Sequence, residues 1–202
     1  MKYRTIANPA ESRISVRGSK FLGYAFPAEN EETISAHLNA VRKQHYSATH
    51  HCFAWQLGYG TGVRSRYHDD GEPSGTAGNP IHRAILRKTL TNVLVISVRY
   101  FGGTKLGTGG LIRAYGRSAA ETLNAARVRT VEEGVRIRFQ GAYEQHPHIL
   151  RTLNTFHVIR LDQDFGEDVT VVAEVDEHDT EKVLRDIRNA TRGEVRGEIC
   201  ET

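Results

Sequence analysis

Long apolar runs and cysteines are both scarce in this sequence. The longest apolar stretch, residues 93–98, reads VLVISV, far short of the ~20 apolar residues that a membrane-spanning helix needs. The opening residues, MKYRTIANPAESR, contain no apolar segment, so we expect no secretory signal. The two cysteines, Cys52 and Cys200, are too few and too far apart for a disulfide framework or a four-cysteine metal site. These absences predict a cytoplasmic protein with reduced thiols and no membrane partner.

The composition is that of a folded protein. The chain has 202 residues, of which 39% are hydrophobic and 25% are charged. Enough apolar side chains are therefore present to build a core, which excludes disorder as the dominant state. The length fits one or two domains of about 100–150 residues each.

Charge and glycine are distributed unevenly. Residues 1–126 carry 16 Lys and Arg against 8 Asp and Glu, whereas residues 127–202 carry 11 against 16. Fourteen of the 19 glycines also lie before residue 127. We therefore expect a domain boundary near residues 127–134, with one domain over 1–130 and a second over 131–202. A polyanionic partner would bind the basic first domain.

The apolar patterns predict an α+β protein with mostly antiparallel strands. In the first domain we expect strands at 12–19, 20–27, 50–57, 64–68 and 92–100. Helices are expected from the Asn30 cap to about 46, from the Asn79 cap to about 88, and over about 111–126. The second domain reads as strands at 135–140, 158–162, 169–175 and 194–200, with helices at 147–156 and 180–190. That order is the ferredoxin-like βαββαβ pattern.

A glycine-rich loop, FGGTKLGTGG at residues 101–110, precedes the third helix. Amides at a helix N-terminus bind anions, and glycine lets an anion approach the backbone. Thr108 is a candidate cap. The loop matches neither a P-loop nor a dinucleotide fingerprint, and a tightly packed turn is the alternative. The candidate phosphate-binding residues are Arg99, Gly102, Gly103, Lys105, Gly107, Gly109, Gly110, Arg113 and Arg117.

A second loop, DDGEPSGTAG at residues 69–78, is acidic. Asp69, Asp70 and Glu72, joined by His50, form a possible acidic site that could bind Mg²⁺ or provide an acid and a base. The spacing is not that of an EF-hand. The alternative, which we favour, is an acidic turn whose carboxylates accept hydrogen bonds from nearby backbone amides.

His50, His51 and Cys52, with His68 downstream, are ligand types that zinc accepts. Adjacent residues of a strand point to opposite faces, so His51 and Cys52 cannot both face one metal ion without distortion. His50 and Cys52 could face one ion, as could either of them with His68 on a paired strand. A Cys-His nucleophilic pair has no evident orienting group. We therefore predict no metal, no cofactor and no catalytic residue here, and we expect Cys52 to be a small buried side chain.

Arginine pairs with helical spacing form the fourth candidate constellation. Arg83 and Arg87 repeat the i,i+4 spacing of Arg113 and Arg117, and such pairs share a helix face. Together they predict one basic face that contacts phosphates without reading bases; scattered, solvated arginines are the alternative. The further members of this face would be Arg64, Arg66, Arg99 and Lys105.

Four segments between residues 19 and 118 resemble the IMPACT family, in its bacterial YigZ-type form. They read SKFLGYAFP, ATHHCFAW, DDGEPSGTAG and VRYFGGTKLGTGGLIRAYGRS. The resemblance implies a first domain with the two-layer α/β sandwich of domain four of elongation factor G. It implies a small second domain like domain five of that factor. Eukaryotic members regulate translation through an additional RWD domain, which we do not expect here, so their protein partner is not carried over.

The resemblance and the basic first domain together predict a translation-related regulator. It would bind RNA or a ribosome-associated surface through the glycine loop and its arginines. One alternative is an enzyme that acts on a phosphorylated small molecule through Asp69, Asp70 and Glu72 together with the second glycine loop. The other is a protein-binding regulator that uses the same loops.

Overall fold

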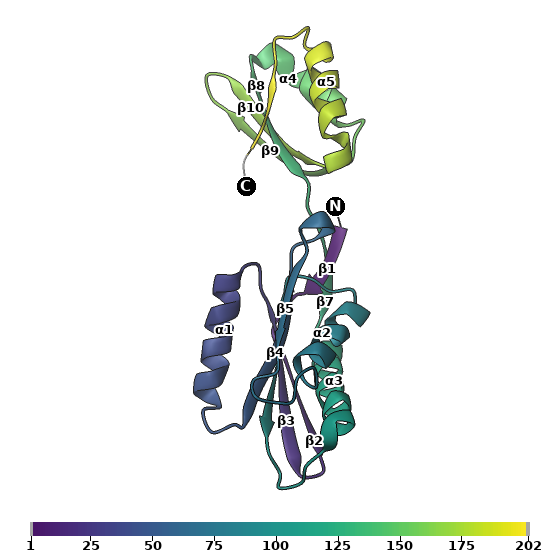
Figure 1. The fold of residues 1–202 in the computed structure, drawn as a ribbon. Helices are drawn as coiled ribbons and strands as arrows, with labels where there is room; N and C mark the ends of the chain where they lie inside the picture. Colours follow the sequence, from purple (N-terminus) through teal and green to yellow (C-terminus); the bar gives the residue numbers. More distant parts are fainter. Residues whose placement is uncertain (1, 201–202) are drawn as a thin grey trace. The chain divides into compact units, whose positions relative to one another are not determined.

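A computed structural model describes residues 2–200 and divides the chain into two compact units. Residues 3–131 form the N-terminal unit, and the remaining described residues, 2 and 132–200, form the C-terminal unit (Figure 1). Both units combine helices with sheets, as the α+β prediction requires. Within residues 2–200, no helix has the length and the apolar character needed to cross a membrane.

The N-terminal unit is built on a five-stranded sheet with the strand order β2-β3-β6-β4-β5, in which each pair of neighbours is antiparallel. The strands are β2 (Ala10–Val16), β3 (Ser19–Pro27), β4 (His50–Leu57), β5 (Arg64–His68) and β6 (Val93–Tyr100). Two strands that we did not predict, β1 (Lys2–Ile6) and β7 (Val128–Glu132), pair in a separate two-stranded sheet. The continuous apolar run in β6 is explained by its central position, where it is buried on both faces.

Helices cover both faces of the five-stranded sheet, so this unit has three layers (Figure 1). On one face lies α1 (Glu31–Gln44); on the other lie α2 (Gly78–Arg87) and α3 (Gly107–Ala125). Along β4, Cys52 packs toward α2 and α3 while its neighbour Phe53 packs toward α1, as the alternation of strand side chains requires. The predicted two-layer sandwich is therefore wrong, because the apolar stripe of α1 buries the second face of the sheet.

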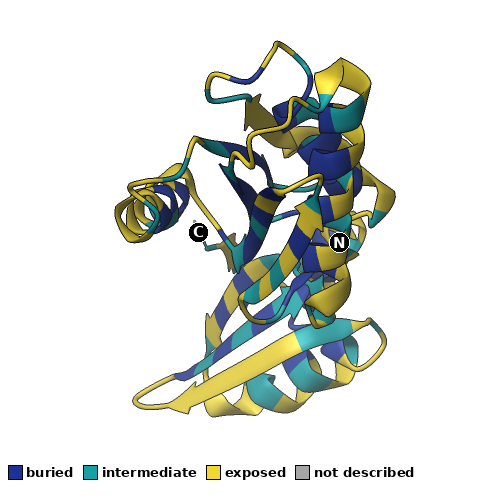
Figure 2. Cartoon of the chain, turned by 90° about the horizontal axis from the view of Figure 1, so that it is seen from below, coloured by how far each residue is buried: buried dark blue, intermediate teal, exposed yellow. Residues whose placement is uncertain are grey.

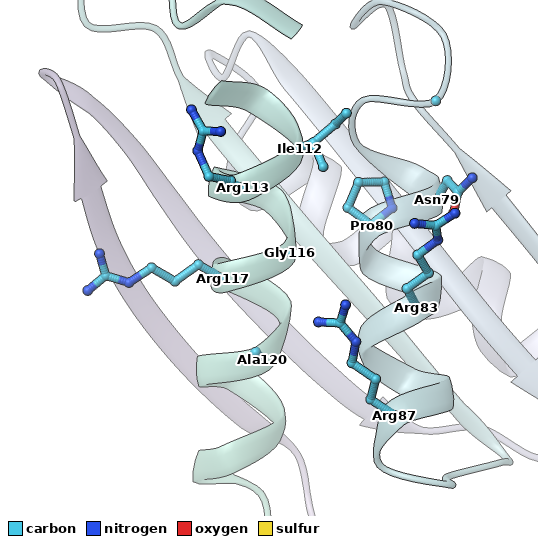
Figure 3. Close-up of a pocket in the computed structure, with 10 residues that line it drawn as sticks. Asn79, Pro80, Arg83, Arg87, Ile112, Arg113, Gly116, Arg117 and Ala120 are labelled. Carbon is cyan, nitrogen blue, oxygen red and sulfur yellow. The ribbon is translucent and has the colours of Figure 1, made fainter. Parts of the chain in front are cut away.

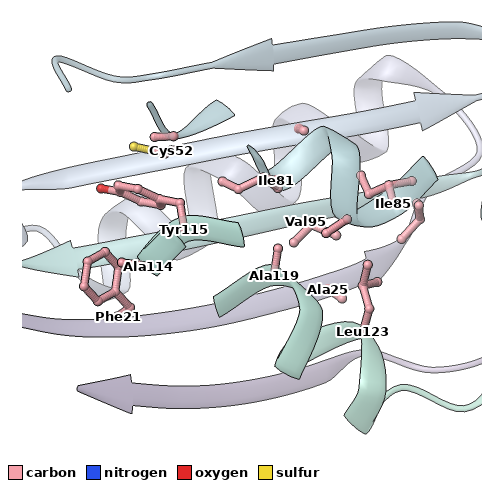
Figure 4. Packing of buried hydrophobic residues seen from close by; sticks show 14 of the residues in the cluster. Phe21, Ala25, Cys52, Ile81, Ile85, Val95, Ala114, Tyr115, Ala119 and Leu123 are labelled. Carbon is pink, nitrogen blue, oxygen red and sulfur yellow. The ribbon is translucent and has the colours of Figure 1, made fainter. Parts of the chain in front are cut away.

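Buried residues concentrate where the helices meet the sheet. The inner faces of the helices are dark blue in Figure 2, and their outer faces are yellow. The core between the sheet and the pair α2 and α3 includes Phe21, Ile81 and Tyr115 (Figure 4). This packing fixes α2 and α3 side by side with their polar sides outward.

The helix caps were predicted correctly at one position of three. Asn30 caps α1, because its side-chain oxygen accepts a hydrogen bond from the Thr33 amide at 2.8 Å. The predicted caps Asn79 and Thr108 are wrong: both residues lie inside their helices, which begin at Gly78 and Gly107.

The C-terminal unit follows the order strand, helix, strand, strand, helix, strand. Its sheet has the order β11-β8-β10-β9, with antiparallel neighbours. The likeness of this unit to domain five of elongation factor G stays a prediction. The elements are β8 (Val135–Gly141), α4 (His146–Leu153), β9 (Val158–Phe165), β10 (Val169–Val175), α5 (Thr180–Ala190) and β11 (Gly197–Ile199).

We expect Asn30→Ala to lower the free energy of unfolding by about 1 kcal/mol, because the first turn of α1 loses its side-chain cap. Urea denaturation followed by circular dichroism measures this change. Asn79→Ala is the matched control, since Asn79 lies within α2 and caps nothing. Equal losses in the two variants would contradict the capping role of Asn30.

Candidate phosphate-binding surface

Acidic side chains are absent from a long central segment of the chain. Residues 73–120 contain no Asp or Glu and seven Lys or Arg. This segment forms α2, β6 and most of α3. Neither α2 nor the part of α3 before Glu121 therefore supplies a carboxylate that could neutralise the positive charge of the arginines on these helices. This signal is present in the sequence, and counting net charge over whole halves of the chain missed it.

A groove of about 470 Å³ runs between α2 and α3. Arg83 and Arg87 come from α2, whereas Arg113 and Arg117 come from α3 (Figure 3). The two arginines of α2 point toward the space between the helices, and those of α3 point to the far side of their own helix. The remaining residues that line the groove are Gly75, Asn79, Pro80, Ile112, Gly116 and Ala120.

A second groove, of about 370 Å³, is also lined by Arg113 and Arg117, here together with Arg17 from the turn between β2 and β3. The two arginines of α3 thus form a ridge shared by both grooves. We call Arg17, Arg83, Arg87, Arg113 and Arg117 the arginine surface. All five are exposed, and none forms an ion pair with any residue in the range 2–200. A phosphate group binding here would displace no carboxylate.

Three other arginines of the predicted basic face do not belong to this surface. Arg99 is only 4% exposed, and its guanidinium contacts Glu72 at 2.6 Å, so its predicted role in contacting phosphate is wrong. Arg64 and Arg66 pair across strands with Leu57 and Trp55, whose side chains pack toward α1. Directly paired residues share a face of the sheet, so Arg64 and Arg66 lie on the side opposite α2 and α3.

The glycines of the loop before α3 have different roles. The Gly102 amide donates a hydrogen bond to Ser19 Oγ at 3.2 Å, and a Cβ at this position would lie 2.0 Å from the carbonyl carbon of Gly18. Gly102 is therefore a packing glycine rather than an anion ligand. Gly103 and Gly107 adopt positive φ angles of 83° and 70°, which glycine tolerates without strain.

The start of α3 leaves amides without helical acceptors. An α-helix provides no internal acceptor for its first few N–H groups, which here include those of Gly107 and Gly109, and the cap residue Leu106 supplies no side-chain acceptor. Lys105 is exposed beside this turn.

Asp69 caps the start of α2 from a distance. Its Oδ1 accepts hydrogen bonds from the Ala77 and Gly78 amides at 2.9 and 2.8 Å, and its Oδ2 accepts one from Gly75 at 2.8 Å. Burial raises the pKa of Asp69, but these three amide donors lower it further, so the net pKa is below its usual value. Asp69 therefore has a structural role.

Asp70 contacts the start of β4, whose first residue is His50. Asp70 Oδ2 accepts a hydrogen bond from the His51 amide at 2.7 Å, and its Oδ1 lies 3.8 Å from the Arg42 guanidinium. His50 Nδ1 donates to the Asp70 carbonyl at 2.7 Å, while its Nε2 lies 3.8 Å from Glu72. These contacts connect the acidic loop to the sheet.

Glu72 lies in the core, with its side chain only 4% exposed. One oxygen, Oε1, accepts from Arg99 at 2.6 Å and from the Tyr115 hydroxyl at 2.7 Å. Burial raises the pKa of Tyr115, which keeps that hydroxyl protonated as a donor. The three carboxylates of the loop thus have three separate sets of partners, and they do not converge on one position.

Cys52 is fully buried, as predicted. Its thiol donates to the Asp69 carbonyl at 3.0 Å, and burial raises the pKa of the thiol well above its usual value. A buried, protonated thiol is a poor nucleophile. Within the described part of the chain, no three His, Cys, Asp or Glu side chains are arranged to hold a metal ion.

We expect Asp69→Ala to lower the free energy of unfolding at pH 7 by about 1 kcal/mol. The pKa of Asp69 is lower in the folded state, so its contribution is complete above the unfolded pKa of about 3.9 and is lost as the pH falls through the folded value. The difference between parent and variant should therefore shrink below pH 4. Urea denaturation at pH 7, 4 and 3 measures it, and a difference independent of pH would contradict the role of the charge.

Glu72→Gln is expected to cost about 3–5 kcal/mol of stability, because it leaves the Arg99 charge buried without a counterion. Glu121→Gln, on the exposed side of α3, is the matched control and should change stability by less than about 0.5 kcal/mol. The double variant Glu72→Gln/Arg99→Met removes both charges and should recover part of the loss. Denaturation midpoints measure all three; no recovery in the double variant would show that the ion pair is not the source of the cost.

Comparison with known proteins places this unit in a family. Residues 17–123 match the family model of the Impact N-terminal domain. The IMPACT family member YvyE of Bacillus subtilis is 39% identical over 122 residues, which is 60% of this chain and 56% of that protein. The IMPACT family member YigZ of Escherichia coli is 36% identical over 109 residues, 54% of this chain and 53% of that protein. The alignments therefore span about half the length of each of these two relatives.

A solved structure resembles the whole chain. It is the crystal structure of a hypothetical protein, with a TM-score of 0.69, 25% sequence identity, and coverage of 99% of this chain and 98% of that one. Both glycine loops and four of the five residues of the arginine surface lie well inside the segment that matches the family model, with Arg17 at its first position. The resemblance inferred from the sequence motifs is thus confirmed, and the chain belongs to the IMPACT family.

Proposed function

We propose that the N-terminal unit binds the phosphate backbone of RNA through the arginine surface, in a translation-related, cytoplasmic role. The observation that carries this proposal is the set of five exposed arginines, without ion-pair partners in residues 2–200, around two helices that contribute no acid before Glu121. The translation-related part is supported by membership of the IMPACT family, through the role that the resemblance implies.

The arrangement suits a chain of phosphates better than a single one. Arg83 and Arg87 are separated by one helical turn, and so are Arg113 and Arg117, so the charges repeat along both helices rather than converging on one point. Lys105 and the amides of Gly107 and Gly109 continue this positive surface at the start of α3. Such a surface neutralises successive phosphates and gives little base specificity.

The acidic loop supports RNA binding rather than phosphate-ester chemistry. Asp69 caps α2, Asp70 contacts β4, and Glu72 neutralises Arg99 in the core. Each carboxylate therefore has partners other than the arginines of the arginine surface. Their separate partners give no support to an enzyme that uses these three acids at one centre.

We expect the double variant Arg113→Ala/Arg117→Ala to weaken binding to all RNA sequences alike. Single-strand binding falls with salt at a log–log slope of about 0.7 per neutralised phosphate, so losing one or two contacts should lower the slope by roughly 1 unit. The measurement is fluorescence anisotropy with a labelled 20-nucleotide oligouridylate at 50 and 200 mM salt.

The matched control is Arg64→Ala/Arg66→Ala, which removes the same charge from the α1 side of the sheet. Its salt slope should stay at the parental value. Failure of the parent protein to bind RNA at 50 mM salt, or equal effects of the two double variants, would refute the proposal.

A further inference from the structure

Tyr67 presents an exposed aromatic ring on the side of the sheet that carries α2. Tyr67 pairs across strands with Ala54, whose side chain belongs to the core beneath α2 and α3. Directly paired residues of antiparallel strands share a face, so the ring points to the α2 side. There it stacks on His82 of α2, with ring centroids 5.8 Å apart and planes 25° apart, and 48% of Tyr67 remains exposed.

The outward side of α2 carries two neighbouring rows of side chains. One row is basic and consists of Arg83 and Arg87, which line the groove toward α3. The other is His82 and Leu86, also four residues apart, and Leu86 is 48% exposed. Residues four apart stack along one side of a helix. We call Tyr67, His82 and Leu86 the aromatic strip, and it lies directly beside two residues of the arginine surface.

The aromatic strip is uncharged at neutral pH. Burial lowers the pKa of His82 below its usual value, so the imidazole is neutral. Its Nε2 atom is buried and has no hydrogen-bond partner among the described residues. The imidazole is thus held by packing and supports one side of the Tyr67 ring. A flat, neutral ring next to a row of cations is the combination that binds a nucleotide, because the base stacks while the phosphate pairs with the cations.

We propose that the aromatic strip stacks an unpaired base of the strand whose phosphates contact the arginine surface, so that the protein prefers single-stranded RNA to a duplex. This inference rests on the proposed function and adds that the bound RNA is single-stranded rather than base-paired. In a duplex, each base face is covered by its neighbours and is not available to Tyr67, whereas the phosphates remain available to the arginines. Stacking on an aromatic side chain contributes about 1–3 kcal/mol per base.

The test compares Tyr67→Ala and Tyr67→Phe in the full-length chain, with a labelled 12-nucleotide RNA and the same RNA in a duplex as probes. Tyr67→Ala should weaken single-strand binding about 5- to 150-fold and duplex binding less than about twofold. Its salt slope should equal that of the parent, because no phosphate contact is removed. Tyr67→Phe keeps the ring and should bind as the parent does.

Tyr46→Ala is the matched control: Tyr46 is 86% exposed but follows the C-terminal end of α1, and its loss should change neither affinity. The inference is overturned if Tyr67→Ala weakens both probes equally, or if Tyr67→Phe binds as weakly as Tyr67→Ala. The stacking inference fails while the proposed function stands if the parent shows no preference for single-stranded RNA but Arg113→Ala/Arg117→Ala still lowers the salt slope. A parent that binds neither probe refutes the proposed function together with it.

Discussion

The buried contact between Glu72 and Arg99 joins the elements that carry the arginine surface. Glu72 lies in the loop before α2, Arg99 lies near the end of the central strand β6, and Tyr115 of α3 donates to the same carboxylate oxygen. One oxygen atom therefore connects three segments that are distant in the sequence. A buried charge without its partner is costly, so the spacing of α2 and α3, and with it the width of the groove between them, depends on this contact.

The acidic loop also explains why the arginines outside remain unpaired. Asp69 accepts hydrogen bonds from the amides at the start of α2, and Asp70 accepts one from the His51 amide near the start of β4. Together with Glu72, these carboxylates are the acids nearest to α2 in the sequence, and all three are held by the protein itself. The helices can then present arginines that form no ion pair within residues 2–200, and such free cations favour phosphate binding at moderate salt.

Local patterns predicted the elements well, whereas contacts between distant segments were not predictable. The strand β4 and the cap Asn30 were correct, because alternation and capping are properties of neighbouring residues. The cap of α2 was missed because it comes from Asp69, eight and nine residues before the amides that it binds. The position of Arg99 in the core was missed for the same reason, since its partner Glu72 lies 27 residues away.

The net charge of the whole chain understates how strongly the N-terminal unit can attract a polyanion. A value of +3 for the whole chain predicts only weak attraction to a polyanion, but the charges are segregated along the sequence and again within the fold. Residues 73–120 hold seven basic side chains and no acid, and one of the seven, Arg99, is neutralised in the core. The others remain outside, and two of them, Arg83 and Arg87, directly follow His82 and Leu86 along α2, where the Tyr67 ring stacks on His82. Affinity for phosphates would then come from the arginine surface and selectivity for unpaired bases from the Tyr67 ring of β5, so different substitutions would change the two properties separately.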